Sequence, residues 1–339
     1  MASLGICVNP MSGRDVRRLA GRASTMTHEA KRDIVARIAT GADAMGITDI
    51  YVTREPFRIA SAALEQIPLQ ARVHVIDHQL ANDASDTQRS VAAYLAAGCR
   101  SFVSLGGDGT NRALVREMLA QQAEQPALDP LVLVPLSTGT NNVFPILAEP
   151  TIAGMVAGLY ANDRVSLDFA QRAKVLHLEL DSGERDIALI DIVQLKDDHV
   201  GNLLPFDAQK LVKLALARAE PDAVGMSPIG GYLDVVDAAA DQGLLVEVGD
   251  GTPVNAPLSP GLFASVAVRN HRRIEFDDPV GFAGPGVLAL DGDRDHKLVQ
   301  GASARVSVRR DGPWVPDLVR VMRYAADAGI MARLPKGET

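Results

Sequence analysis

Short apolar runs alternate with helix-period segments along the first part of the 339-residue chain. Five such runs have the length and composition of buried strands. Between two of them, a segment that Asn82 or Asp83 can cap places Val91 and Leu95 on one helix face. Strands and helices in this order predict a parallel sheet with helices on its faces. The expected strands are Leu4–Val8, Ile47–Thr53, Ala71–Ile76, Ser101–Leu105 and Leu131–Pro135.

The pattern changes after Pro150. One expected helix, Ile152–Tyr160, is followed by apolar runs that alternate with period two and are separated by Gly, Pro and Asp, which predicts an antiparallel, β-rich region. A lone helix is expected at Asp207–Arg218, and the tail from Pro316 to Met331 again has helical spacing. The expected strands here are Val175–Leu180, Ile187–Leu195, Leu244–Val248, Leu262–Val268, Gly286–Leu290 and Ala304–Val308.

The sequence therefore predicts an α/β fold with two domains. Residues 1–150 would form a doubly wound parallel-sheet domain for nucleotide binding, and 151–311 a β-rich antiparallel domain for the acceptor. Residues 312–339 are expected to return to the first domain. A hydrophobic content of 47% and a mean hydropathy of +0.06 are those of a folded protein.

The net charge and the N-terminal segment argue against several classes of protein. Lys and Arg number 34 against 42 Asp and Glu, a net charge of −8 that argues against nucleic-acid binding. The run Leu4–Val8 follows no basic segment and precedes no cleavage site, so we expect neither a signal peptide nor a membrane span. A cytoplasmic homo-oligomer that acts on a small molecule is the expectation.

The most specific motif is GGDGT at 106–110, between an expected strand and a helix. Glycines at such a turn let backbone amides face a phosphate, and the helix N-terminus adds partial positive charge. It is not a Rossmann fingerprint, because Arg112 occupies the third glycine position. The chain has no P-loop and no lysine between Lys31 and Lys174, so amides, Arg112 and a metal ion would neutralise phosphate. The expected phosphate-binding residues of this turn are Gly106, Gly107, Gly109, Thr110 and Arg112.

Asp108 is the candidate for catalysis in this motif. A carboxylate held among glycines at the carboxyl edge of the sheet can ligate Mg²⁺ or accept a proton from an attacking hydroxyl, and phosphoryl transfer requires both. The alternative is a tight turn in which Asp108 merely caps the helix. Two adjacent glycines followed by Asp-Gly-Thr exceed what a cap needs, so the functional interpretation is favoured.

Two further polar loops follow expected strands. Residues 137–142 place five short polar side chains around Gly139, and Asn9-Pro10 follows the first strand. Because the carboxyl ends of parallel strands meet at one edge, where open α/β sheets bind ligands, these loops and the GGDGT turn are expected to form one crevice.

An acidic cluster follows the strand that ends at residue 290. Asp291, Asp293 and Asp295 alternate as in the start of a calcium loop, but His296 occupies the glycine position, so that interpretation fails. Three carboxylates this close repel one another, and a bound cation or Arg294 would offset the repulsion. The alternative is a solvated hairpin turn.

These motifs resemble the superfamily that joins ATP-dependent NAD kinases with diacylglycerol and sphingosine kinases. GGDGT at 106–110 followed by GTNN at 139–142 carries the likeness, and NPMSG at 9–13 is similar to the Asn-Pro element that lipid kinases use near the ATP phosphates. With STGTNNVFP at 137–145 and AVGMSPIGG at 223–231, the pattern is most similar to the acetoin catabolism protein X branch. The resemblance covers nearly the full chain.

The resemblance implies an ATP- and Mg²⁺-dependent kinase that phosphorylates a hydroxyl group, with NAD(H) as the default acceptor and the active site between the domains. Asp293 would stand for the glutamate of an Asp-Gly-Glu element and act with Asp108 in catalysis. Asp108 and Asp291 are the expected Mg²⁺ ligands. The remaining expected contacts are Asn9, Thr138, Gly139 and Thr140 for ATP phosphates, and Asn141, Asn142 and Asp191 for the acceptor.

Two departures from the family pattern concern NAD. Asp191 aligns with the acidic member of the adenine-binding pair of NAD kinases, but Ile190 replaces the asparagine. The stretch that lines their NAD site also has no counterpart near 246–257. Kinase chemistry is therefore better supported than NAD as acceptor. The alternatives are a lipid or small-polyol kinase of the same fold, and a non-catalytic nucleotide-binding regulator linked to acetoin catabolism.

Overall fold

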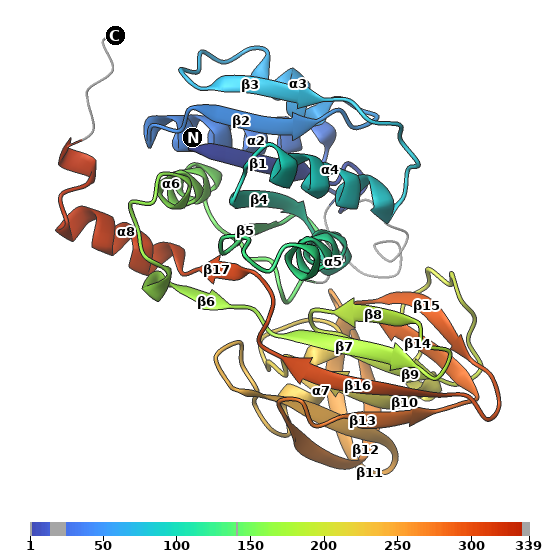
Figure 1. Cartoon of the computed structure of the whole chain (residues 1–339). Helices are drawn as coiled ribbons and strands as arrows, with labels where there is room; N and C mark the ends of the chain where they lie inside the picture. The colour runs from blue at the N-terminus through green and yellow to red at the C-terminus, as the bar shows by residue number, and fades with distance from the viewer. Residues whose placement is uncertain (1, 14–24, 140–141, 334–339) are drawn as a thin grey trace.

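A computed structural model describes residues 2–13, 25–139 and 142–333, which form two domains stacked one on the other (Figure 1). The first domain is built on a seven-stranded sheet in the order β3-β2-β1-β4-β5-β17-β6. The first six of these pair in parallel, and β6 pairs antiparallel with β17. The strands are β1 (Ser3–Val8), β2 (Asp49–Thr53), β3 (Arg72–Ile76), β4 (Ser101–Gly106), β5 (Val132–Ser137), β6 (Ala170–Arg172) and β17 (Trp314–Pro316).

Helices cover both faces of this sheet, as the alternating pattern predicted. One face packs against α2, α3, α6 and α8, and the other against α4 and α5. The side chains of Val91 and Leu95 are buried on α4, whose N-cap is Asp83, as expected. The helices are α2 (His28–Ala44), α3 (Ile59–Leu64), α4 (Ala84–Ala96), α5 (Asp108–Glu124), α6 (Pro150–Ala161) and α8 (Leu318–Asp327).

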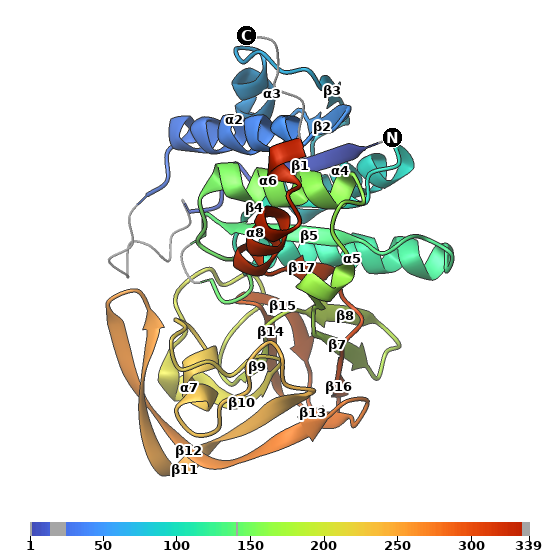
Figure 2. The same cartoon turned by 90° about the vertical axis from the view of Figure 1, so that its left-hand side faces the viewer.

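Two antiparallel sheets form the second domain. One has the order β12-β11-β10-β9-β14-β15 and the other β13-β16-β7-β8, and a shared apolar core lies between them. The β11–β12 hairpin bends toward the first domain, and the short helix α7 (Ser227–Gly231) lies beside the larger sheet (Figure 2). The strands are β7 (Val175–Leu180), β8 (Arg185–Ala188), β9 (Asp191–Leu195), β10 (Leu211–Leu216), β11 (Gln242–Ser259), β12 (Leu262–Glu275), β13 (Val280–Ala283), β14 (Gly286–Leu290), β15 (Asp293–Leu298) and β16 (Ser303–Arg309).

The expected helix at Asp207–Arg218 is wrong. Only a 3-10 turn, Ala208–Lys210, forms there, and the rest is strand β10. Leu214 and Leu216 of this segment face one apolar core while Ala215 faces the other, so alternate residues are buried on both faces of a central strand. Burial of both faces gives a continuous apolar run that resembles a helix in sequence.

The first domain extends beyond residue 150, where we expected it to end. Helix α6 packs against α2, and β6 joins the seven-stranded sheet. The chain crosses to the second domain at Ala173 and returns at Gly312, where the two crossings are joined by hydrogen bonds from Ala173 N to Pro313 O at 2.8 Å and from Gly312 N to Ala173 O at 3.1 Å. We therefore propose to draw the boundary after residue 173. None of the helices in the described part of the chain is long and apolar enough to cross a membrane.

Candidate active site

A cleft of about 880 Å³ lies between the two domains. The loops after β1 and β4 line it from the first domain, and the turn between β14 and β15 lines it from the second. Strand β1 lies between β2 and β4, so the direction of strand order reverses between β1 and β4. Open α/β sheets bind ligands at such a reversal, outside the carboxyl ends of the strands. The topology itself therefore favours a ligand in this cleft.

The turn between β4 and α5 brings backbone amides to the cleft. Helix α5 begins at Asp108, and its N-cap Gly107 makes no side-chain cap hydrogen bond. A Cβ at Gly107 would lie 3.1 Å from Asn142 Oδ1, and one at Gly109 would lie 3.0 Å from Asp293 Oδ2. Amides at a helix start carry partial positive charge, and glycine lets a phosphate approach them. The turn can therefore hold a phosphate group and has little room for a larger residue.

Asp108 lines the cleft and is held by amides of the neighbouring loop. Its carboxylate accepts hydrogen bonds from Phe144 N at 2.9 Å and from Val143 N at 3.2 Å. Burial, with the charge of Asp291, raises the pKa of Asp108 to about 7, and the two hydrogen bonds offset only part of this increase. A carboxyl group with a pKa near 7 is suited to general base catalysis at neutral pH.

Two more carboxyl groups, from the second domain, line the cleft. Asp291 accepts hydrogen bonds from the amides of Leu189 and Ile190, both at 2.8 Å. Asp191 is 7% exposed, and its Oδ1 has no hydrogen-bond partner among the described residues. Burial raises the pKa of both groups, and repulsion by Asp291 raises the pKa of Asp191 further. An unpaired buried carboxyl oxygen costs free energy unless a ligand or cation contacts it.

Arg112 joins α5 to β15 and does not line the cleft. Its Nη2 lies 3.2 Å from Asp293 Oδ2, and its Nη1 lies 2.7 Å from Asp295 Oδ2. The expected phosphate contact by Arg112 therefore has no support, because this charge is already paired with two carboxylates. We expected a bound cation or Arg294 to offset the acidic cluster. Arg112 pairs with Asp293 and Asp295 instead of Arg294, which pairs with Asp198 at 3.4 Å.

The loop after β1 is fixed from behind by Lys31 of α2. The Lys31 side chain is fully buried, and its Nζ donates to the carbonyls of Asn9, Pro10 and Ser12, each at 2.8 Å. Asn9 Nδ2 donates to Thr110 Oγ1 at 2.8 Å, which ties the loop to the start of α5. Asn9 was expected at this edge of the sheet, whereas nothing in its sequence context marked Lys31 as its support.

The structure brings most of the expected site residues together. The expected residues that line the cleft are Asn9, Gly107, Asp108, Gly109, Thr110, Gly139, Asp191, Asp291 and Asp293. Those in the described part of the chain that do not line it are Gly106, Arg112, Thr138 and Asn142. Thr140 and Asn141 lie outside the described residues.

Thr138 and Asn142 support the loops from behind. Thr138 Oγ1 lies 2.7 Å from Ser12 Oγ, which joins the loops after β5 and β1. Asn142 Nδ2 donates to Ser137 Oγ at 2.6 Å, while its Oδ1 is buried between Gly107 and Gly139. The contacts of Asn142 are thus with the loops, and the acceptor role that we expected for it remains a proposal.

Sequence reasoning missed the part of the cleft wall that comes from outside the polar loops. The amides of Val143 and Phe144 are unremarkable in sequence, and their role depends on a fold that brings them to Asp108. From the second domain the missed lining residues include Leu203, Phe206, Leu258 and Ser259. The resemblance gave two signals, since Met226 lies in the AVGMSPIGG stretch, and Leu258 and Ser259 lie in APLSPGLF at 256–263, and all three line the cleft.

The cleft offers carboxylates for a metal ion, although the described residues form no preformed cage. No group of three or more His, Cys, Asp or Glu side chains in the described ranges could hold a metal ion by itself. Mg²⁺ commonly binds through one or two carboxylates together with water and substrate phosphates, so such a cage is not required. The unpaired Asp191 Oδ1 and the Asp108 and Asp291 carboxylates, all at the cleft, fit that pattern.

One solved structure with a similar fold is that of a kinase. Yeast NADH kinase complexed with NADH matches with a TM-score of 0.53 at 13% identity, over 98% of this chain and 90% of that one. A putative diacylglycerol kinase from Bacillus anthracis str. Sterne matches with a TM-score of 0.43 at 10% identity, over 93% of this chain and 96% of that one. The first similarity shows a kinase-like fold.

Sequence comparison identifies the family. Residues 174–311 match the acetoin catabolism protein X C-terminal domain. Acetoin catabolism protein X of Cupriavidus necator is 31% identical over 350 aligned positions, which cover 98% of this chain and 95% of that protein. With the glycine turn, the acidic cleft and the kinase-like fold in place, the chain belongs to the acetoin catabolism protein X family.

Proposed function

We propose that this protein transfers a phosphoryl group from ATP to a hydroxyl group in the cleft between its domains. The observation that carries the proposal is the position of Asp108, at the start of α5 and among the glycine amides, with a pKa raised to about 7. A phosphate held by those amides would lie beside a carboxyl group that can accept the proton of an attacking hydroxyl.

Each part of the cleft has a role in this proposal. The amides of Gly107, Gly109 and Thr110 would hold the ATP phosphates, with partial positive charge from the start of α5. Asp108 would accept the acceptor's proton, and Asp293, beside Gly109, would help to orient the hydroxyl. Asp191 and the expected ligand Asp291 would hold Mg²⁺, which when bound neutralises phosphate charge, and Asp108 would stay free to act as the base.

NAD(H) is the default acceptor in this proposal, supported by the fold shared with yeast NADH kinase. The buried Ile190, in place of the asparagine of the NAD kinase pair, argues for a different contact to any adenine there.

A lipid or other alcohol with an apolar body is the second candidate, and the rim of the cleft favours it. Met11 is 57% exposed, Phe57 43% and Leu203 63%, and all three line the cleft. Large apolar side chains exposed together at a cleft mark a surface for an apolar ligand. These residues can cover the apolar part of an acceptor while its hydroxyl reaches Asp108.

The test is a screen for ADP release with ATP and Mg²⁺ across NAD, NADH, diacylglycerol and sphingosine in vesicles, and short diols. Release with an acceptor, lost in Asp108→Asn but kept in Asp250→Asn, would support the proposal, since Asp250 is an exposed acid of the β11–β12 hairpin. ADP release with none of the acceptors, although ATP binds, would contradict catalysis and favour a nucleotide-binding regulator.

A further inference from the structure

A second cavity, of about 500 Å³, lies where the chain crosses between the domains. We call it the crossover cavity and define it by the lining residues Phe144, Phe169, Arg172, Lys174, Arg218 and Arg320. Its wall includes both crossing segments, since Ala173 and Val315 also line it. It shares Phe144 with the loop that binds Asp108, yet none of the described residues that line it also lines the cleft. The two cavities are therefore separate sites.

The titratable side chains around the crossover cavity are mostly basic. Arg172, Lys174, Arg218 and Arg320 line it, and the acid that lines it is Asp317. The Asp317 carboxylate caps α8 by accepting from Arg320 N at 3.0 Å. Of the basic side chains, Arg218 has a counter-charge, because it donates to both carboxylate oxygens of Glu220 at 2.8 and 2.9 Å.

The other three cations contact backbone carbonyls rather than carboxylates. Arg172 donates to the carbonyls of residues 311 and 312, both at 3.2 Å, and Arg320 lies over the Phe169 ring and 3.5 Å from the carbonyl of residue 168. None of the ion pairs among the described residues includes Arg172, Lys174 or Arg320. Carbonyl oxygens satisfy N–H donors but leave the positive charge without a counter-charge.

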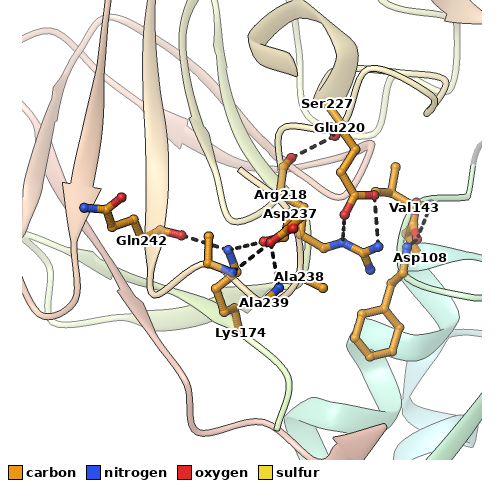
Figure 3. Close-up of polar contacts among 12 residues, drawn as sticks. Asp108, Val143, Lys174, Arg218, Glu220, Ser227, Asp237, Ala238, Ala239 and Gln242 are labelled. Atoms are coloured by element: carbon orange, nitrogen blue, oxygen red, sulfur yellow. Dashed lines mark hydrogen bonds and ion pairs between the residues drawn. The ribbon is translucent and has the colours of Figure 1, made fainter. Parts of the chain in front are cut away.

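Lys174 is the most costly of these cations. It is 4% exposed, and its Nζ donates to the carbonyls of Asp237 and Gln242 at 2.8 Å each (Figure 3). An ammonium group has three donors, so one N–H of Lys174 has no partner among the described residues. A buried cation that lacks a counter-charge destabilises the fold unless an anion pairs with it.

We propose that the crossover cavity binds a small organic phosphate, a phosphate monoester with an apolar body. A dianionic phosphate presents three oxygens, which suits donors that arrive from Arg172, Lys174 and Arg320 on separate elements. Phe144 and Phe169 supply an apolar wall, and the volume suits a ligand of metabolite size. This site does not depend on the activity proposed for the cleft.

Phenyl phosphate is the probe, with benzoate as a monoanion and phenol as a neutral analogue. Trp314 is the one tryptophan in the sequence, and it packs in the same apolar core as Phe169 of the cavity wall, so its fluorescence is a local probe of binding. Phenyl phosphate is expected to bind saturably and more tightly than benzoate or phenol, and to weaken as salt is raised. No saturable binding at millimolar concentration, or equal binding of benzoate, would overturn the proposal.

Variants show which of the two cavities binds phenyl phosphate. Arg320→Ala, at an exposed position that should tolerate the change, is expected to weaken phenyl phosphate at least about tenfold, whereas Arg323→Ala on the same helix is expected to have no effect. Gly109→Ala, which obstructs the cleft, should leave binding intact. Binding that survives Arg320→Ala but is lost in Gly109→Ala would assign the probe to the cleft and refute the crossover site.

Proton uptake gives an independent readout. Burial, with the charges of Arg310 and Arg218, lowers the pKa of Lys174 to about 7, against weaker opposing effects of Asp237 and Glu220. At about pH 8, where phosphate monoesters are dianionic, binding should raise this pKa and take up as much as about one proton per site. Calorimetry in buffers of different ionisation enthalpy measures the uptake, and Lys174→Met should abolish it. Tight binding without proton uptake would contradict the role of Lys174.

Discussion

The cleft and the crossover cavity differ in charge, although Phe144 forms a wall of one and hydrogen-bonds Asp108 in the other. Carboxyl groups gather in the cleft, where burial raises their pKa values. Basic groups gather in the crossover cavity, where burial lowers the pKa of Lys174. Figure 3 shows Arg218 between Lys174 and Asp108, and its charge lowers the pKa of both. On the two proposals above, buried like charges mark ligand sites of opposite preference in one molecule.

The strongest test of the acidic site is Asp108→Asn. Asparagine keeps the size of the side chain and an oxygen for the Phe144 amide, but it cannot serve as a base. We expect phosphoryl transfer to fall by about 100-fold or more while the fold is retained, with a thermal unfolding temperature at neutral pH that is no lower than that of the wild type. ADP formation with the acceptor from the screen, and circular dichroism on heating, measure the two effects. Near-normal turnover would remove Asp108 from catalysis.

Variants of Asp293 distinguish the effect of a carboxylate in the cleft from the effect of its ion pair with Arg112. Asp293→Ala is expected to lower kcat by about tenfold or more with little change in ATP affinity, and Asp293→Glu to keep most of the activity, because the carboxylate is retained. Asp295→Ala is the matched control, since Asp295 pairs with the same Arg112 but does not line the cleft. An equal loss of kcat in Asp295→Ala would show that the Arg112 pairing, and not a cleft carboxylate, is what matters.

A variant of the glycine turn tests whether the backbone amides of this turn bind an anion in the acidic cleft. Gly109→Ala adds a Cβ that would lie 3.0 Å from Asp293 Oδ2 and beside the amides that face the cleft. We expect ATP affinity to fall several-fold, up to about tenfold, in equilibrium titrations. Gly281→Ala on β13 is the control, because a Cβ there meets nothing within 4 Å. Unchanged ATP affinity in Gly109→Ala would contradict phosphate binding by this turn.

The pH dependence of stability should have opposite signs in the two regions. Asp108 has a folded pKa of about 7 against an ordinary 3.8, so the folded state holds the extra proton and its stability falls as pH rises from about 4 to 7. Lys174 has a folded pKa of about 7 against an ordinary 10.5, so the unfolded state holds the extra proton and stability rises from about pH 7 to 10. Each contribution is at most about 4 to 5 kcal/mol.

Urea unfolding across these pH ranges measures how the free energy of unfolding changes with pH in each range. Asp108→Asn should remove the pH dependence of the unfolding free energy only between about pH 4 and 7. Lys174→Met should remove it only between about pH 7 and 10. If either variant removed the pH dependence in the other range, the two regions would be one coupled network, and the comparison between them would fail.

The sequence predicted β1 to β5 of the first domain, because each is a short apolar run between polar loops, but it did not predict the three-residue strands β6 and β17. It also predicted that GGDGT forms a turn from a strand into a helix, because strand, glycines, acid and helix are adjacent in the chain. The prediction of a helix at Asp207–Arg218 was wrong because LVKLALA is compatible with either a helix or a strand buried on both faces. Only the two apolar cores on either side of it determine that it forms a strand.

Contacts between distant segments account for the rest. Lys31 reaches a loop about twenty residues away, Asp291 accepts from amides about a hundred residues earlier, and Arg172 and Arg320 meet at one cavity. No local pattern encodes such pairs, because each depends on how helices and strands cross in the finished fold. The motifs therefore located the cleft, but not what supports it, and gave no sign of the crossover cavity.

The buried ammonium of Lys31 has a consequence for the entropy of binding. Its three carbonyl contacts and the Asn9–Thr110 hydrogen bond fix the loop after β1 when the chain folds. A ligand that meets this loop then finds it already ordered, so the conformational entropy of the loop is not lost again on association. Replacing Lys31 by Met would leave three carbonyls without their donor and move that entropy cost from folding to binding.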